Sequence, residues 1–119
     1  MMEFVNKLEE VPLYQIEKWL KDWGNLYVHF KGKLIAKVGE AIHSETGETL
    51  YLYKEYVPEL EDFHPTQTWA RPMGMFLENK PYSNEPRFKP VTPIEAAKLL
   101  YPIINQQYLK SNPFKSLEQ

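Results

Sequence analysis

Alternating hydrophobic and polar positions dominate the middle of the chain. Residues 34–56 predict two long β-strands joined by a tight turn at residues 44–47. Gly47 can take the left-handed backbone conformation that closes a three-residue hairpin loop after a type I turn, and Ser44 suits the first turn position. Gly39 has no side chain to pack, so it predicts a bulge or a sharp bend in the first strand. One face of that strand is expected to carry Leu34, Ala36, Val38 and Ile42.

Shorter strands are predicted on both sides of this hairpin. Residues 26–30 alternate as a first strand, and residues 67–71 form a later short strand that Pro72 ends. Residues 73–77 are predicted to form a turn followed by a last short strand. Residues 57–66 lack a hydrophobic period and contain prolines and acids, which indicates a solvated loop.

Helical patterns occupy both ends of the chain. Pro12 suits the first turn of a helix, and apolar residues recur after it at helical spacing. The motif from Thr92 to Glu95 combines an N-cap hydroxyl, a proline and a capping-box glutamate, so a second helix is predicted to begin at Pro93. Pro102 is expected to kink or divide that helix, because it removes a backbone donor.

Length and composition favour one domain, residues 1–119, with a β core at residues 25–90 and helical extensions at 1–24 and 91–119. The chain has no cysteine, which excludes disulfides and thiol chemistry and favours a reducing, cytoplasmic setting. We expect neither an export signal nor a membrane-spanning helix, because no long apolar run is present.

Charge makes nucleic acid an unexpected partner. Residues 24–90 carry eight Lys or Arg against nine Asp or Glu, a net charge of −1. A domain that neutralises several phosphates usually has a clear basic excess. Binding of single-stranded nucleic acid is kept as a third hypothesis, because aromatic residues and four cations are available to line a groove: Lys31, Lys33, Lys54 and Arg71.

The histidines do not have the spacing of metal ligands. His29, His43 and His64 are far apart in the sequence, and no nucleophile elbow or phosphate-binding glycine loop is present. We therefore predict no catalytic residue, metal or cofactor. The rival hypothesis is a small enzyme that uses His29 or His43 as general base, with Glu45 or Arg71 assisting.

Six residues on the predicted strands combine aromatic rings with polar groups: Tyr27, His29, Tyr51, Tyr53, Trp69 and Arg71. On a shared exposed face the rings would form a docking groove, with Arg71 as an anion anchor. The alternative is that the rings pack beneath the two helices as part of the core.

Five blocks of sequence resemble a known family. They are YVHFKG at 27–32, AIHSETGE at 41–48, YLYK at 51–54, WARPMGMF at 69–76 and PRF at 86–88. In order and spacing they are similar to the small bacterial family catalogued as domain of unknown function 1653, over about residues 26–90. That family is thought to adopt a small SH3-like barrel, and the resemblance implies this fold here. Its activity is not established.

We thus expect a mostly β (α+β) protein, an SH3-like barrel with N- and C-terminal helical extensions. Its expected function is that of a non-catalytic binding module for a peptide or a small anionic ligand. The predicted ligand-binding residues are Tyr27, His29, His43, Glu45, Tyr53, Trp69 and Arg71. His43 and Glu45 are included because turn geometry explains Gly47 but not these two neighbours. The apolar stripes of the helices are open to two roles, packing on the barrel or joining two subunits in a homodimer.

Overall fold

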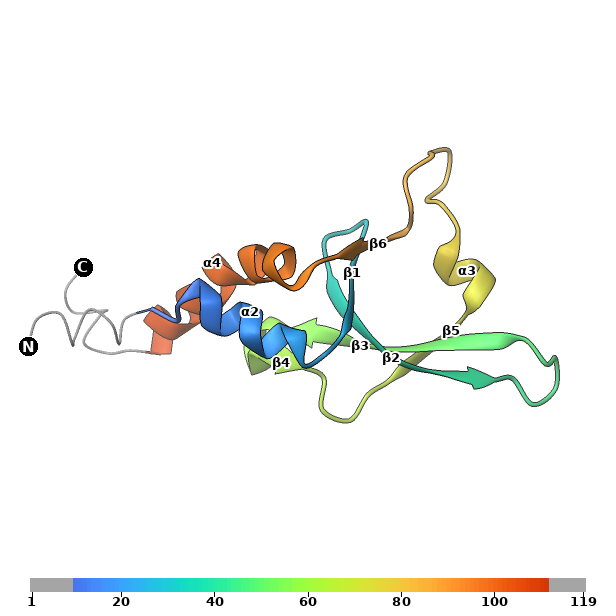
Figure 1. Ribbon diagram of the computed structural model, residues 1–119, viewed down its shortest axis with the longest axis horizontal. Helices are drawn as coiled ribbons and strands as arrows, with labels where there is room; N and C mark the ends of the chain where they lie inside the picture. Colours follow the sequence, from blue (N-terminus) through green and yellow to red (C-terminus); the bar gives the residue numbers. More distant parts are fainter. Residues whose placement is uncertain (1–9, 112–119) are drawn as a thin grey trace, which may run out of the picture. The chain divides into compact units, whose positions relative to one another are not determined.

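The computed structural model describes residues 10–111, and side chains as far as residue 106. Over these residues the fold is α+β, with a six-stranded antiparallel sheet and three helices (Figure 1). The chain forms two compact units, one of them Trp23–Thr92 and the other made of the segments before and after it. The outer parts of the two predicted helical extensions, residues 1–9 and 112–119, lie outside the described residues.

The helical unit consists of α2, Leu13–Lys21, and α4, Pro93–Ser111, which contact each other. Both helices begin where the sequence predicts, directly after Pro12 and at Pro93. α4 continues through Pro102 as one helix, so of the two predicted effects of this proline, a kink or a division, the division does not occur. Their buried apolar residues are Ile16, Leu20, Ala96, Ala97, Leu100 and Ile104.

Asn105 holds α4 to the segment that precedes α2. Its side chain is buried; its Oδ1 accepts the Val11 N–H at 2.6 Å, and its Nδ2 donates to the Val11 carbonyl at 3.3 Å. The same Nδ2 donates to the Tyr101 carbonyl at 2.9 Å. A buried amide with its hydrogen bonds made fixes the pairing of these segments more specifically than apolar packing does.

The other unit contains the sheet. Its strands are β1 Asn25–His29, β2 Leu34–Ile42, β3 Thr49–Val57, β4 Asp62–Phe63, β5 Trp69–Pro72 and β6 Phe88–Val91. Their order is β4-β3-β2-β1-β6, and β5 also pairs with β3. The sheet of the described residues does not close, so the SH3-like barrel is not confirmed.

Two short helical segments lie where the sequence predicts none. The predicted loop at residues 57–66 contains a 3₁₀ turn, η1 Pro58–Leu60, and the short strand β4. The predicted turn and strand at residues 73–77 is wrong, because this segment is the helix α3, Met73–Leu77. A five-residue helix carries too short a pattern to identify itself, and packing of Phe76, which is 1% exposed, stabilises it.

A bulge in β2 confirms the prediction made from Gly39. The register against β3 shifts between Lys37 and Gly39, so Val38 is the extra residue. The bulge reverses the alternation after it, which brings Lys37 and Glu40 to the same face, where Nζ and Oε2 are 2.7 Å apart. This hydrogen bond raises the pKa of Lys37, whose ammonium lies 3.9 Å from the Tyr51 ring centroid.

The shared face predicted for Leu34, Ala36, Val38 and Ile42 is wrong for the same reason. Leu34 and Ala36, before the bulge, are 5% and 0% exposed, whereas Val38 is 43% and Ile42 66% exposed. An extra residue in a strand moves every later side chain to the opposite face.

The hairpin turn has one residue more than predicted. The His43 N–H donates to the Glu48 carbonyl and the Gly47 N–H to the His43 carbonyl, both at 2.9 Å, which leaves residues 44–47 in the loop. Gly47 has φ of +76°, the left-handed conformation that the sequence predicts for it.

We expect Gly47→Ala and Gly74→Ala to change stability in opposite directions. Gly47→Ala should lower the free energy of unfolding by about 1 kcal/mol, because a Cβ is strained at positive φ. A Cβ at Gly74, inside α3, would meet nothing within 4 Å, so alanine there should raise stability by roughly 0.5–1 kcal/mol. Urea unfolding of both variants measures this. Equal effects would contradict the assigned backbone conformations.

Candidate functional site

The register of the strands brings the six singled-out residues to one face of the sheet. Residues directly opposite in an antiparallel pair share a face, and Tyr51 pairs with Arg71, Tyr53 with Trp69 and His29 with Phe88. Tyr27 lies on the same face, because it pairs with Ile35 and Ile35 pairs with Glu55. Glu55 is two residues after Tyr53 on the same strand, so these two side chains share a face. The common face contains Tyr27, His29, Tyr51, Tyr53, Trp69 and Arg71.

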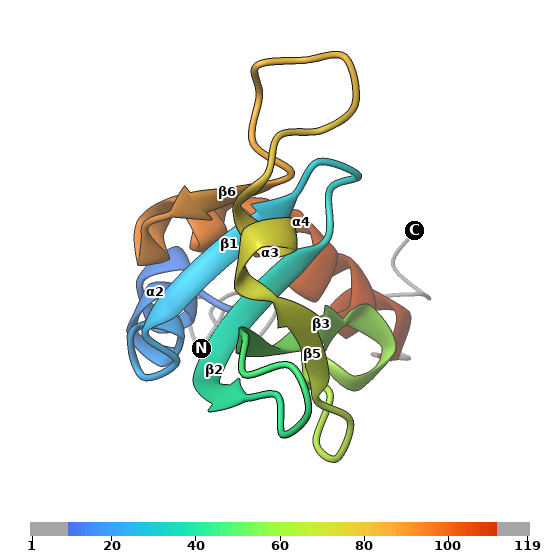
Figure 2. The same cartoon turned by 90° about the vertical axis from the view of Figure 1, so that its right-hand side faces the viewer.

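α3, which contacts β3 and β5, covers part of this face (Figure 2). The ring of Phe76 makes edge contacts with three tyrosines, at centroid distances of 5.1, 5.2 and 5.8 Å for Tyr27, Tyr51 and Tyr53. The same ring stacks on Phe88 at 4.2 Å with an interplanar angle of 3°. Tyr53 therefore belongs to the core cluster, and Tyr27 and Tyr51 pack against it beside α3.

Beside this core lies a cavity of about 240 Å³. Its walls come from five strands and from the turn between β1 and β2. The lining residues are His29, Lys31, Lys33, Ile35, Tyr53, Glu55, Arg71 and Phe88. The cavity therefore gathers His29, Tyr53 and Arg71 from the predicted site. Trp69 is 43% exposed and is not among the lining residues.

Arg71 is the most distinctive group in the cavity wall. Its guanidinium carbon lies over the Phe88 ring, 5.4 Å from the ring centroid, which is within the range of a cation–π contact. Among the described residues, neither Arg71 nor Lys31 has a carboxylate partner, whereas Lys33 pairs with Glu55 at 3.5 Å. The cavity thus has an excess of positive charge.

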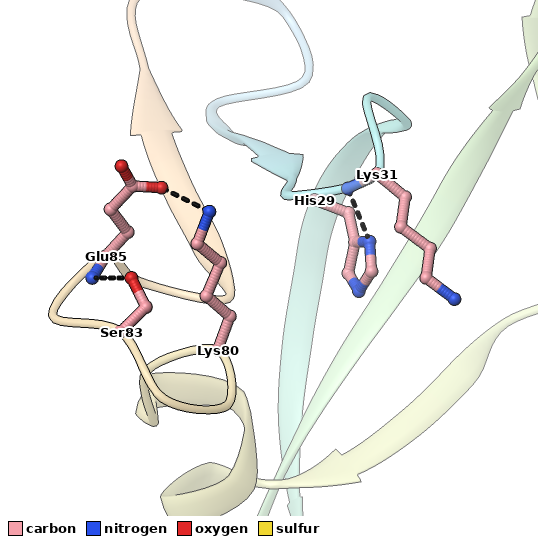
Figure 3. A network of polar contacts seen from close by, with 5 residues as sticks. All are labelled: His29, Lys31, Lys80, Ser83 and Glu85. Carbon is pink, nitrogen blue, oxygen red and sulfur yellow. Dashed lines mark hydrogen bonds and ion pairs between the residues drawn. The ribbon is translucent and has the colours of Figure 1, made fainter.

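His29 lines the cavity as a hydrogen-bond donor. Its Nδ1 accepts the backbone N–H of Lys31 at 3.2 Å (Figure 3), so the neutral ring carries its proton on Nε2. Burial disfavours the imidazolium and, together with the positive charges of Lys31 and Arg71, lowers the pKa of His29 from its ordinary value of 6.5. The neutral form of the ring therefore predominates at pH 7.

His43 and Glu45 lie at the tip of the hairpin and do not line this cavity. His43 Nδ1 accepts the N–H groups of Glu45 and Thr46, at 3.1 and 3.3 Å, and so stabilises the turn. His64 Nδ1 has the same role for Thr66 and Gln67, at 3.3 and 2.9 Å. In each case histidine resembles an Asx turn, in which a side chain accepts a nearby backbone N–H. These hydrogen bonds give His43 a structural role in the turn.

Sequence reasoning did not assign Lys31, Lys33, Ile35, Glu55 and Phe88 to this site. The two lysines carry a local signal, because they flank Gly32, whose φ of +95° forms the turn. Glu55 and Phe88 have no such signal, since only their long-range pairing with β2 and β1 places them here.

A second cavity, of about 420 Å³, lies beside the β1–β2 turn and the segment before β6. It is lined by Val28, His29, Phe30, Gly32, Lys80, Glu85, Pro86 and Lys89. Lys80 and Glu85 form an ion pair with each other, which lowers the pKa of Glu85 (Figure 3). Only Lys89 offers a cation without a carboxylate partner among the described residues, so this cavity is a weaker site for a charged ligand.

The part of the chain that the structure describes contains neither a metal-binding cluster nor a membrane-spanning helix. No group of three or more His, Cys, Asp or Glu residues there is placed to hold a metal ion. None of the described helices has the length and hydrophobicity needed to cross a bilayer.

A family model described as "Protein of unknown function (DUF1653)" matches residues 25–90, which is more than half of the chain. The protein belongs to the DUF1653 family. No curated protein and no solved structure matches the chain. All residues that line the 240 Å³ cavity lie inside the matched DUF1653 segment, whereas α2 and α4 lie outside it.

We expect His29 to make the DUF1653 protein less stable in mild acid. Because the pKa of His29 is lowered in the folded state, its contribution to stability is complete above pH 6.5 and is lost as the pH falls from 6.5 through the folded pKa. His29→Asn retains an acceptor for the Lys31 N–H but does not titrate. Thermal unfolding between neutral pH and pH 5 should therefore depend less on pH in His29→Asn than in the wild type, and identical profiles would contradict the lowered pKa.

Proposed function

We propose that this DUF1653 protein is a non-catalytic binding protein that holds a small anionic ligand in the 240 Å³ cavity. The observation that carries the proposal is Arg71, which lies over the Phe88 ring and has no carboxylate partner among the described residues. A guanidinium in that position is suited to bind a carboxylate or phosphate through two parallel hydrogen bonds. The ligand is small, because pockets for drug-sized molecules usually measure roughly 300–1,000 Å³.

The hydrogen-bonding state of His29 supports binding over catalysis. A general base needs a nitrogen lone pair directed at the substrate. The lone pair of Nδ1 is engaged by the Lys31 N–H, and Nε2 carries the proton. His29 thus supplies a donor that supplements Arg71 and Lys31 around an anion, and the rival hypothesis of a His29 general base has less support.

The distribution of ion pairs favours a compact anion over an extended nucleic acid. Lys80 pairs with Glu85, and Arg87 pairs with Glu78 at 3.2 Å, so these cations are already neutralised. A phosphate backbone is bound by a row of available cations, whereas the cavity concentrates two of them around one space. The expected cytoplasmic location, SH3-like barrel and homodimer through the helices stay predictions.

Arg71→Gln should weaken the binding of small anions. We would titrate acetate, succinate, citrate and inorganic phosphate by isothermal calorimetry. For each anion that binds the wild type, the variant should lose affinity by roughly tenfold to a hundredfold, since a hydrogen bond to a charged group contributes about 1.5–3 kcal/mol.

The matched control is Lys89→Gln, which removes a cation that lines the other cavity. It should leave the affinities unchanged. If Arg71→Gln and Lys89→Gln weaken binding equally, the anion is attracted by overall charge, and the proposed site is wrong.

A further inference from the structure

The anion cavity also contains a carboxylate. Glu55, on β3, lines the same space as Arg71 and His29. For a ligand that carries only negative charge, this residue is unfavourable, because like charges repel most strongly where water is partly excluded. The presence of both signs around one small space suggests a ligand that itself carries both signs.

The ion pair of Glu55 with Lys33 leaves this carboxylate available. The two groups are 3.5 Å apart, and the side chains are 32% and 54% exposed. Such exposed pairs contribute little to stability, so a ligand cation can replace the lysine at small cost. By contrast, Lys37 and Glu40 are 2.7 Å apart, which shows how much closer a pair in this sheet can be.

Both charges act on the same imidazole. Lys31 and Arg71 lower the pKa of His29, whereas Glu55 raises it. The positive and negative groups are therefore within electrostatic range of one point in the cavity wall. The apolar remainder of the wall is formed by Ile35, Tyr53 and Phe88.

We propose that the ligand is a zwitterion of the α-amino-acid type, with an apolar side chain. Its carboxylate accepts hydrogen bonds from Arg71 and from His29 Nε2, its ammonium donates to Glu55, and its side chain contacts the apolar wall. This inference rests on the proposed function, because it takes the anion site at Arg71 as the carboxylate site. A volume of about 240 Å³ suits a free amino acid, whereas a dicarboxylate or a phosphate ester would place a second negative charge near Glu55.

The test compares three forms of one ligand by isothermal calorimetry. The standard L-amino acids with apolar side chains are titrated first, and the one that binds most tightly is then compared with its deaminated acid and its decarboxylated amine. The wild type should bind the amino acid at least about tenfold more tightly than either analogue, as expected for the loss of one charge-assisted hydrogen bond.

Glu55→Gln and Arg71→Gln then separate the two ends of the ligand. Glu55→Gln should abolish the preference for the amino acid over the deaminated acid while retaining affinity for that acid. Arg71→Gln should weaken the binding of both the amino acid and the deaminated acid. Glu85→Gln, which removes an acid that lines the other cavity, is the matched control and should change neither. If Glu55→Gln does not fold, the comparison of the amino acid with its two analogues on the wild-type protein still tests the zwitterion inference.

Two contrary results have different meanings. If the deaminated acid binds the wild type as tightly as the amino acid does, the zwitterion inference is wrong, and the anion site stands as long as Arg71→Gln weakens that acid. If neither compound binds and other small anions also fail to bind, both the inference and the proposed function are wrong.

Discussion

The stack of Phe76 on Phe88 is the contact on which both the core and the cavity depend. The two rings are parallel within 3° at a centroid distance of 4.2 Å, and both side chains are buried. Phe76 comes from a helix of five residues that has little stability of its own, so the burial of this ring is what holds α3 on the sheet. The Arg71 guanidinium in turn lies over the Phe88 ring. The same aromatic packing thus stabilises the sheet unit and forms the cavity. In that cavity a cation lies beside a neutral hydrogen-bond donor.

Much of the sheet could be predicted from local sequence, because glycine has physical requirements that do not depend on the rest of the fold. Gly39 predicted the bulge and Gly47 the left-handed turn residue. The consequences of the bulge were harder to predict. A single extra residue, Val38, reverses the alternation after it, and the exposure of Ile42 follows from that. α3 could not be predicted, since its conformation is decided by the packing of Phe76 rather than by its own sequence.

The residues of the site fall into the same two groups, those that local sequence identifies and those that only the fold brings together. His29 and Arg71 were identifiable as polar residues on otherwise aromatic strands, and the register places both in the cavity. Glu55 and Phe88 lie there only because of pairings between strands distant in the sequence. His43 was selected for its lack of a structural explanation, and the hydrogen bonds that its Nδ1 accepts supply one. A polar side chain beside a turn can accept hydrogen bonds from nearby backbone N–H groups, and this structural role has to be considered before a function is assigned to it.

The chemistry of the cavity depends on which nitrogen of His29 carries the proton. With the proton on Nε2, Arg71, Lys31 and His29 present donors to the ligand, as an anion requires. Long-range proton–nitrogen NMR correlation spectra of the histidine rings at neutral pH test this directly. We predict a neutral His29 ring with a protonated Nε2 and an unprotonated Nδ1, whose Nε2 resonance shifts when a bound anion is added. A proton on Nδ1, with a free lone pair on Nε2, would contradict the account and restore His29 as a potential base.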